Sequence, residues 1–201
     1  MTALPGSPPL LEALLAASAA RHRHLCPRQV LGVRMGLLAG EVLGLPFPRK
    51  DKRVMVLVET DGCFADGVSV ASGCWLGRRT LRLLDYGRVA ATFVDTRTGQ
   101  AVRLAPQTDL RQRVRQGRPE GQRRWDAYLQ AYRELPDEAL FTVTPVRLTL
   151  DLAAIISVPG YRVSCEMCGE EVVNEREVVV DGRTLCRACA GDAYYQPAAS
   201  G

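Results

Sequence analysis

The stretch HRHLCPRQVLGVRMGLLAGEVLG, residues 22–44, predicts a closely packed helix that follows an extended segment. Pro27 suits the first position of a helix, and apolar side chains recur from there to Leu43 at helical spacing. Glycines also recur at every fourth position, at residues 32, 36, 40 and 44. Because a residue without a side chain permits close approach, this row indicates packing against a sheet or another helix.

The segment before this helix holds both histidines of the chain. His22, His24 and Cys26 share one face of an extended chain, whereas positions two apart do not face each other in a helix. Cys26 is expected at the N-cap, where the helix dipole and free N–H groups favour a thiolate. We predict that His24 and Cys26 form half of a transition-metal site or part of a reactive thiol pair. The alternative is that Cys26, Cys63 and Cys74 are small buried residues and that the histidines cap a helix.

The remaining ligands are expected in ETDGCFADG, residues 59–67, which follows the apolar strand RVMVLVET, residues 53–60. Cys63 is the main candidate there, and Cys74 is a weaker one. Asp61 and Asp66 would support a ligand or accept a proton. Cys26, Cys63, Asp61 and Asp66 are therefore the candidate catalytic residues.

The order of the predicted elements indicates an α+β fold, in which N-terminal helices pack on a mixed, mostly antiparallel sheet. Ser7 would cap a first helix that begins at Pro8. Further strands are predicted at 80–85, 88–96, 100–106 and within 139–150, and helices within 107–135. We divide the chain into a core domain (8–158), a cysteine-rich module (161–195) and a disordered tail (196–201).

The module is a predicted zinc site. CEMCGEEVVNEREVVVDGRTLCRAC contains Cys165 and Cys168, then 17 residues, then Cys186 and Cys189. This spacing lies in the range of four-cysteine zinc sites, which are closed and structural. Asp-Gly at 181–182 predicts a hairpin between the pairs, and a helix can begin after Cys186. A cysteine turn, a hairpin and a helix in this order resemble a treble-clef finger.

Composition excludes some classes of protein. No apolar run reaches the length of a membrane span, and LLEALLAASAA lacks the basic residues that precede a signal sequence, so we predict a cytoplasmic protein. Seven cysteines without a signal sequence argue against a disulfide framework. The arginine-rich segment 111–124 allows a nucleic-acid contact, but no aromatic residues interleave with the arginines, which favours a solvated surface.

Three segments resemble the signatures of the FmdE family, which is named after one subunit of formylmethanofuran dehydrogenase. They are HRHLCPRQVLGVRMGLLA, ETDGCFADGVSVASGCWLGRRTL and DYGRVAATFVD, in the order and spacing of that family. The resemblance covers residues 10–105 closely and the finger loosely. Arg23 and Arg28 stand where the first signature has glycine, which puts the shape of that loop in doubt.

The resemblance implies an α+β core followed by a treble-clef finger, in a homodimer. It also implies a core metal, most simply zinc, held by His24, Cys26 and Cys63, with His22 as a supporting ligand. Arg78 stands where many members have lysine, and Arg78 and Arg79 would face an anionic substrate. Subunits of a molybdenum or tungsten enzyme are the implied partners.

Two functions follow from these observations. The first is an accessory or metal-dependent subunit, in which three protein ligands leave one position open, as in catalytic zinc sites. The second is a regulatory module that binds a partner protein or nucleic acid through the finger and the arginine-rich segment. The sequence does not decide whether the protein is an enzyme. If it is one, it is metal-dependent or an oxidoreductase subunit related to formylmethanofuran dehydrogenase.

Overall fold

The computed structural model describes residues 8–198 and divides the chain into two compact units, Met1–Leu148 and Thr149–Gly201. The predicted cap Ser7 and the last residues of the predicted tail, 199–201, lie outside the described residues. The division comes before residue 158, where the sequence predicts the end of the core. Its physical basis is that Arg176 of the second unit donates to the carbonyls of Ala154 and Ile155 at 2.7 and 2.8 Å.

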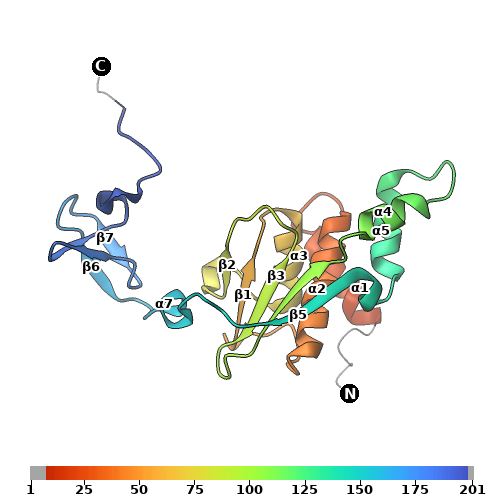
Figure 1. Ribbon diagram of the computed structural model, residues 1–201, viewed down its shortest axis with the longest axis horizontal. Helices are drawn as coiled ribbons and strands as arrows, with labels where there is room; N and C mark the ends of the chain where they lie inside the picture. The colour runs from red at the N-terminus through yellow and green to blue at the C-terminus, as the bar shows by residue number, and fades with distance from the viewer. Residues whose placement is uncertain (1–7, 199–201) are drawn as a thin grey trace. The chain divides into compact units, whose positions relative to one another are not determined.

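The first unit is an α+β domain built on one mixed sheet (Figure 1), as the sequence predicts. Its helices are α1 (Pro8–Ala19), α2 (Pro27–Val42), α3 (Cys63–Ser72), α4 (Leu110–Gln116), α5 (Arg124–Glu134) and α6 (Asp137–Leu140), with a 3-10 turn η1 (Leu76–Arg78). Its strands are β1 (Val54–Val58), β2 (Leu81–Leu83), β3 (Ala91–Asp95), β4 (Ala101–Pro106) and β5 (Phe141–Val146). The strand order is β2-β1-β3-β4-β5, and of these described strands only β1 and β2 pair in parallel.

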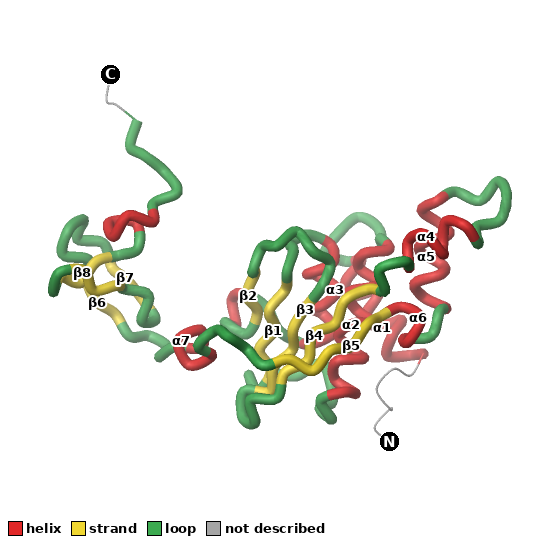
Figure 2. Tube along the Cα trace, viewed as in Figure 1, coloured by secondary structure: helices red, strands yellow, loops and turns green. Residues whose placement is uncertain are grey.

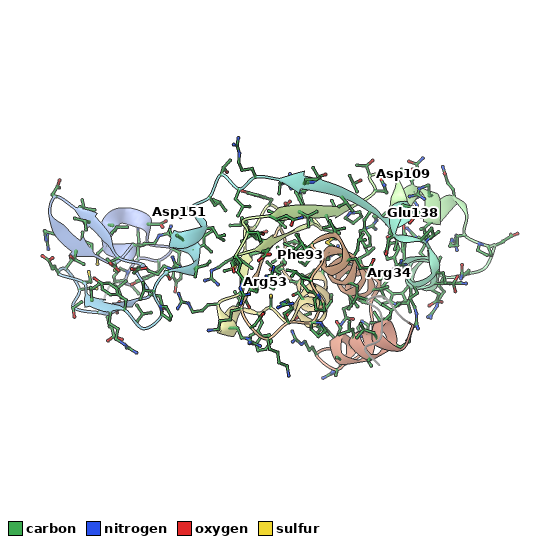
Figure 3. All side chains as sticks on the ribbon, turned by 90° about the horizontal axis from the view of Figure 1, so that it is seen from below. Arg34, Arg53, Phe93, Asp109, Glu138 and Asp151 are labelled. Carbon is green, nitrogen blue, oxygen red and sulfur yellow. The ribbon has the colours of Figure 1, made fainter. Side chains whose placement is uncertain are left out.

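The helices α2 and α3 lie along one face of this sheet (Figure 2). Alternate residues of β1 and β3 point toward them, because successive side chains of a strand face opposite sides. Phe93 is fully buried between sheet and helices (Figure 3), and Phe64 of α3 is buried equally completely. Pro145, which lacks an N–H for a ladder, lies in the edge strand β5, as expected.

The row of glycines in α2 brings this helix against α3. A side-chain carbon at Gly32 would lie 2.3 Å from the carbonyl oxygen of Phe64, and one at Gly67 would lie 2.4 Å from that of Gln29. Real carbon atoms do not approach oxygen so closely, so both positions require glycine. The predicted close packing of α2 is confirmed, and its partner is a helix.

Arg34 connects α2 to the segment that follows α5. Its guanidinium donates to the carbonyl of Leu135 at 2.5 Å and to that of Tyr132 at 3.2 Å. It also donates to the carboxylate of Asp137 at 2.6 Å. Because the last carbonyls of a helix lack intrahelical partners, this arginine satisfies them and holds α5 and α6 on the core.

Two bidentate ion pairs also tie the strands together. Arg53 donates to the buried carboxylate of Asp95 at 3.0 and 2.7 Å. Arg103 donates to the buried carboxylate of Glu59 at 2.6 and 2.9 Å, and Arg88 lies 2.7 Å from the same group. These contacts hold the pKa of Asp95 and that of Glu59 below their usual ranges.

The second unit is made of short elements. It contains α7 (Leu152–Ile156), β6 (Arg162–Ser164), β7 (Glu171–Val173), β8 (Val178–Val180), β9 (Arg183–Leu185) and a helical turn η2 (Ala188–Asp192). The strands form two antiparallel hairpins, β6–β7 and β8–β9. Asp181 and Gly182 both have positive φ in the second hairpin, as an Asp-Gly turn requires. Among the described helices of both units, none combines the length and apolar character needed to cross a bilayer.

Candidate metal centre and ligand cavity

The four cysteines of the second unit converge on one point. The sulfur atoms of Cys165, Cys168, Cys186 and Cys189 all lie within 4.8 Å of one another. The sulfur atoms of Cys168 and Cys186, which come from the two halves of the module, are 4.0 Å apart. Four thiolates at this spacing are the donor set of a tetrahedral zinc site, so the residues fit the metal that the sequence predicts.

Backbone hydrogen bonds form the two turns that carry these cysteines. The N–H of Gly169 donates to the carbonyl of Cys165 at 2.9 Å, which closes the first turn. In the second turn the N–H of Cys189 donates to the sulfur of Cys186 at 3.4 Å. Among the described residues of this unit, the apolar cluster has only Cys165, Val172 and Leu185 as buried members. A unit with so small a core depends on its metal for stability.

The first unit contains a cavity of about 690 Å³ at the end of the sheet where β4 enters α4. The segment before α2, the first turns of α2 and α3, and the helices α4 and α5 form its wall. The wall includes three of the predicted metal ligands, His24, Cys26 and Cys63. The volume is that of a typical small-molecule site.

Cys26 is the N-cap of α2, as predicted. Its sulfur accepts from the N–H of Gln29 at 3.4 Å, and the side chain of Gln29 accepts from the N–H of Cys26 at 2.7 Å. The expectation of a favoured thiolate is wrong. Burial raises the pKa of the Cys26 thiol and outweighs the Gln29 N–H, and the neighbouring thiol of Cys63 raises it further.

Cys63 is the first residue of α3, and its thiol is near enough to that of Cys26 to raise the pKa of the Cys26 thiol. His24 lies on the same cavity wall, with its ring 5.6 Å from the indole of Trp125 in α5. Within residues 10–198, whose side chains the structure describes, three or more ligand atoms within 4.8 Å of one another occur only in the finger. His24 therefore does not join the two thiols at ligand spacing.

His22 points elsewhere. Its Nε2 lies 2.7 Å from the carboxylate of Asp66 in α3, and Arg21 donates to Ser69 of the same helix at 3.3 Å. These contacts attach the segment before α2 to α3. Asp66 is thus occupied by His22, and neither Asp66 nor the exposed Asp61 lines the cavity.

The predicted anion contacts also lie away from the cavity. Arg78 donates to the carbonyl of Lys50, and its guanidinium lies 4.7 Å from the ring centre of Trp75. Arg79 follows it at the end of η1, and neither arginine lines the cavity. Cys74 is buried, and its sulfur donates to the carbonyl of Val54 at 3.3 Å. It is a packed core residue, as the alternative interpretation predicts for it.

Sequence reasoning missed the wall formed by α5. Trp125, Tyr128 and Tyr132 line the cavity from this helix, and Arg111 of α4 lies 5.4 Å from the ring centre of Tyr128. Burial raises the pKa of Tyr132 to about 12, so its hydroxyl is a hydrogen-bond donor at neutral pH. The sequence contains a signal for this wall, because the three aromatic residues are spaced by three and four positions and therefore share one face of a helix.

Comparisons with known proteins identify both parts of the chain. Residues 21–142 match the family model FmdE, described as molybdenum formylmethanofuran dehydrogenase operon. Residues 159–195 match the model of the prokaryotic dksA/traR C4-type zinc finger. The first match covers the cavity wall, and the second covers the four clustered cysteines.

One curated relative and one solved structure extend these matches. A probable S-adenosyl-L-methionine-binding protein of Archaeoglobus fulgidus is 32% identical over 92% of this chain, which spans only 54% of that protein. The crystal structure of a tungsten formylmethanofuran dehydrogenase FmdE-like protein from Syntrophus aciditrophicus has a TM-score of 0.61. It is 22% identical, over 92% of this chain and 95% of that one. At this identity the second likeness establishes the fold alone.

Proposed function

The chain belongs to the FmdE family and carries a C4 zinc finger, and from that premise we propose that its core unit is a metal-dependent small-molecule-binding protein. His24, Cys26 and Cys63 hold one transition-metal ion at the cavity wall, and its binding draws the His24 ring from Trp125 to the two thiols, since the ring does not lie at ligand spacing in the structure. The finger holds a second, structural zinc ion. The protein acts as an accessory or metal-dependent subunit, and the cavity is where its ligand meets the core metal.

The observation that carries this proposal is the pairing of Cys26 with Cys63. The two thiols come from the first turns of different helices and interact on the wall of the 690 Å³ cavity. Structural cysteines such as Cys74 pack inside the core instead, where they meet backbone carbonyls. Cys63 is partly exposed and Cys26, although buried, lines the same wall, so a metal or a ligand in the cavity would meet both.

The types of donor suit a metal ion. Two thiols and an imidazole suit zinc, and also nickel, copper or iron, and such a set leaves one coordination position for water or a ligand. A bound metal supplies a Lewis acid at this wall. The contact between His22 and Asp66 attaches the segment before α2 to α3 and so positions Cys26 beside Cys63.

The name of the Archaeoglobus relative suggests one ligand to test. That protein is a probable S-adenosyl-L-methionine-binding protein, and this chain spans about half of its length. Aromatic side chains such as Trp125 and Tyr128 attract cations and stack on planar rings, which suits a sulfonium and an adenine. S-adenosylmethionine is therefore a probe for the cavity.

The finger has a supporting role in this proposal. Its cysteine turns, hairpins and helical turn occur in the order of a treble clef, and we assign it to that class. A four-cysteine site has no open position, so its metal is structural. The homodimer and the molybdenum or tungsten partner subunits stay predictions.

The test is the metal content of the full chain, purified without a histidine tag and measured by elemental analysis. The proposal predicts about two metal ions per wild-type chain and about one for Cys63→Ser. Cys74→Ser is the matched control, because it alters a core cysteine outside the cavity and should leave the content unchanged. His24→Ala should resemble Cys63→Ser.

An unchanged metal content in Cys63→Ser would contradict the core site. A wild-type content of about one, lost entirely in Cys186→Ser, would do the same, because only the finger would then bind metal. Circular dichroism of each variant shows whether a lower content follows from loss of a ligand or from unfolding.

A further inference from the structure

A second cavity, of about 600 Å³, adjoins the one with the thiols. The two cavities share Thr108, Arg111, Arg124 and Tyr128 in their walls, so they form one continuous cleft. The second cavity adds Arg115 of α4. None of the described residues that line the cleft carries a carboxylate. One end of the cleft has three guanidinium groups, and the other has two thiols and the guanidinium of Arg28.

Other arginines of the same segment have partners. Arg113 lies 3.0 Å from the carboxylate of Asp109, and Arg123 lies 2.8 Å from that of Asp126. These pairs use the nearby acidic groups on the outer sides of α4 and α5. Asp109 and Asp126 are therefore not available to the arginines of the cleft.

The arginines of the cleft are left with their charge uncompensated. Among the residues that the structure describes, neither Arg111, Arg115 nor Arg124 forms an ion pair with a carboxylate. Three like charges at one cavity repel one another unless an anion lies between them. A phosphate monoester matches this set, since it carries nearly two negative charges and three acceptor oxygens.

Aromatic side chains lie between the arginines and the thiols. Tyr128 belongs to both cavities, with Arg111 5.4 Å from its ring centre. Trp125 lies further toward the thiols, 5.6 Å from the ring of His24. Half-exposed aromatic faces of this kind stack on planar rings, whatever the identity of the ring.

We propose that this cleft binds a small phosphate monoester that carries a planar ring. The phosphate lies among Arg111, Arg115 and Arg124, and the ring stacks on Trp125 and Tyr128. The far end of the molecule then lies beside Cys26 and Cys63. This inference rests on the proposed function only in using the same cavity, and it does not require the core metal.

The chain provides a fluorescent reporter for the test. It has two tryptophans, Trp125 in the cleft and Trp75 beside Arg78 outside it. Trp75→Phe leaves Trp125 as the only indole and retains an aromatic ring next to Arg78. Titration of this variant with adenosine 5′-monophosphate should change the fluorescence of Trp125 to saturation, whereas adenosine should bind at least about tenfold more weakly.

Charge-neutral variants test the arginines. Arg115→Gln and Arg124→Gln should each weaken binding of the monophosphate about tenfold, since each removes one charge-assisted contact. Arg118→Gln is the matched control, because Arg118 belongs to the same segment but does not line this cleft. These arginines are exposed, so folding should be unaffected, and circular dichroism checks this.

The proposal is overturned if the monophosphate does not bind, or if it binds no better than adenosine or S-adenosylmethionine. It is also overturned if only a single-stranded oligonucleotide binds, since the cleft arginines would then belong to a nucleic-acid surface. Measuring Cys63→Ser in the same assay separates the two proposals. Loss of metal without loss of monophosphate binding supports both, whereas unchanged metal with intact binding contradicts only the core metal site.

Discussion

The two units of the protein use cysteine in opposite ways. In the finger, four sulfur atoms lie within 4.8 Å of one another, around a small core with Cys165, Val172 and Leu185 buried. In the first unit, Cys26 and Cys63 lie on a cavity wall of a domain that buries large side chains such as Phe64, Phe93 and Leu104 completely. In the finger the cysteines converge on one point, whereas in the first unit two of them line a cavity.

The difference follows from the size of the two apolar cores. Each large apolar side chain that is buried contributes about 1.5–3 kcal/mol, and the first unit buries many of them, so we expect it to fold without a metal. The finger cannot offset its loss of chain entropy by burial, and its metal supplies the missing free energy. We therefore expect Cys26 and Cys63 to be available for binding a ligand, because the fold of the first unit should not depend on them.

The largest expected effect comes from breaking the finger. Cys186→Ser removes one of four thiolates, and metal binding contributes about 10 kcal/mol to the folding of such a module. We expect the finger to unfold while the helices of the first unit remain. Limited proteolysis with circular dichroism measures both, and Met167→Ser, between two ligands but exposed, is the control.

Loss of helical signal in Cys186→Ser would contradict the independence of the first unit. Retention of full zinc content and protease resistance would show that the finger does not need four ligands.

Overpacking between α2 and α3 should have the next largest effect, and this effect concerns the first unit. Gly32→Ala forces a methyl group to within 2.3 Å of the carbonyl oxygen of Phe64, and we expect a loss of about 3 kcal/mol in the free energy of unfolding. Urea denaturation followed by circular dichroism measures it. The finger should retain its zinc.

The matched control is Gly117→Ala, where the added carbon would make an ordinary contact of 3.4 Å. If both variants lose the same stability, the close crossing of the two helices is not what requires glycine at position 32.

Acid should affect the two units at different pH values, and this effect should be smaller than those of the two substitutions above. The pKa of Asp95 and that of Glu59 are lowered in the folded state. The two carboxylates therefore stabilise the first unit fully at pH values above their unfolded pKa values of about 4. This stabilisation is lost as the pH falls below that point. Protons displace zinc from thiolates at higher pH, so the finger should release its metal before the first unit loses stability.

Asp95→Asn should flatten the dependence of the melting temperature on pH below about pH 4. Asp61→Asn is the control, since Asp61 is exposed and makes no ion pair among the described residues. If the melting temperature of both variants depends equally on pH, the contact with Arg53 does not stabilise the first unit.

The sequence predicted the local elements of the fold well. Pro27 begins α2 with Cys26 as its cap, and Asp181-Gly182 forms a hairpin turn. Each of these depends on a few consecutive residues, for which backbone geometry is decisive. The expected thiolate at Cys26 was wrong because burial, a property of the whole fold, outweighs the local N–H group.

The sequence by itself determined the finger, since two Cys-x-x-Cys pairs suffice to specify a metal site. It also determined that α2 packs closely, through glycines spaced along one face. Only the tertiary structure decided that Cys26 meets Cys63, that His22 turns to Asp66, and that α5 supplies Trp125 to the same cavity. The reason is that these contacts join segments far apart in the chain, and packing of the core, not residue spacing, brings such segments together.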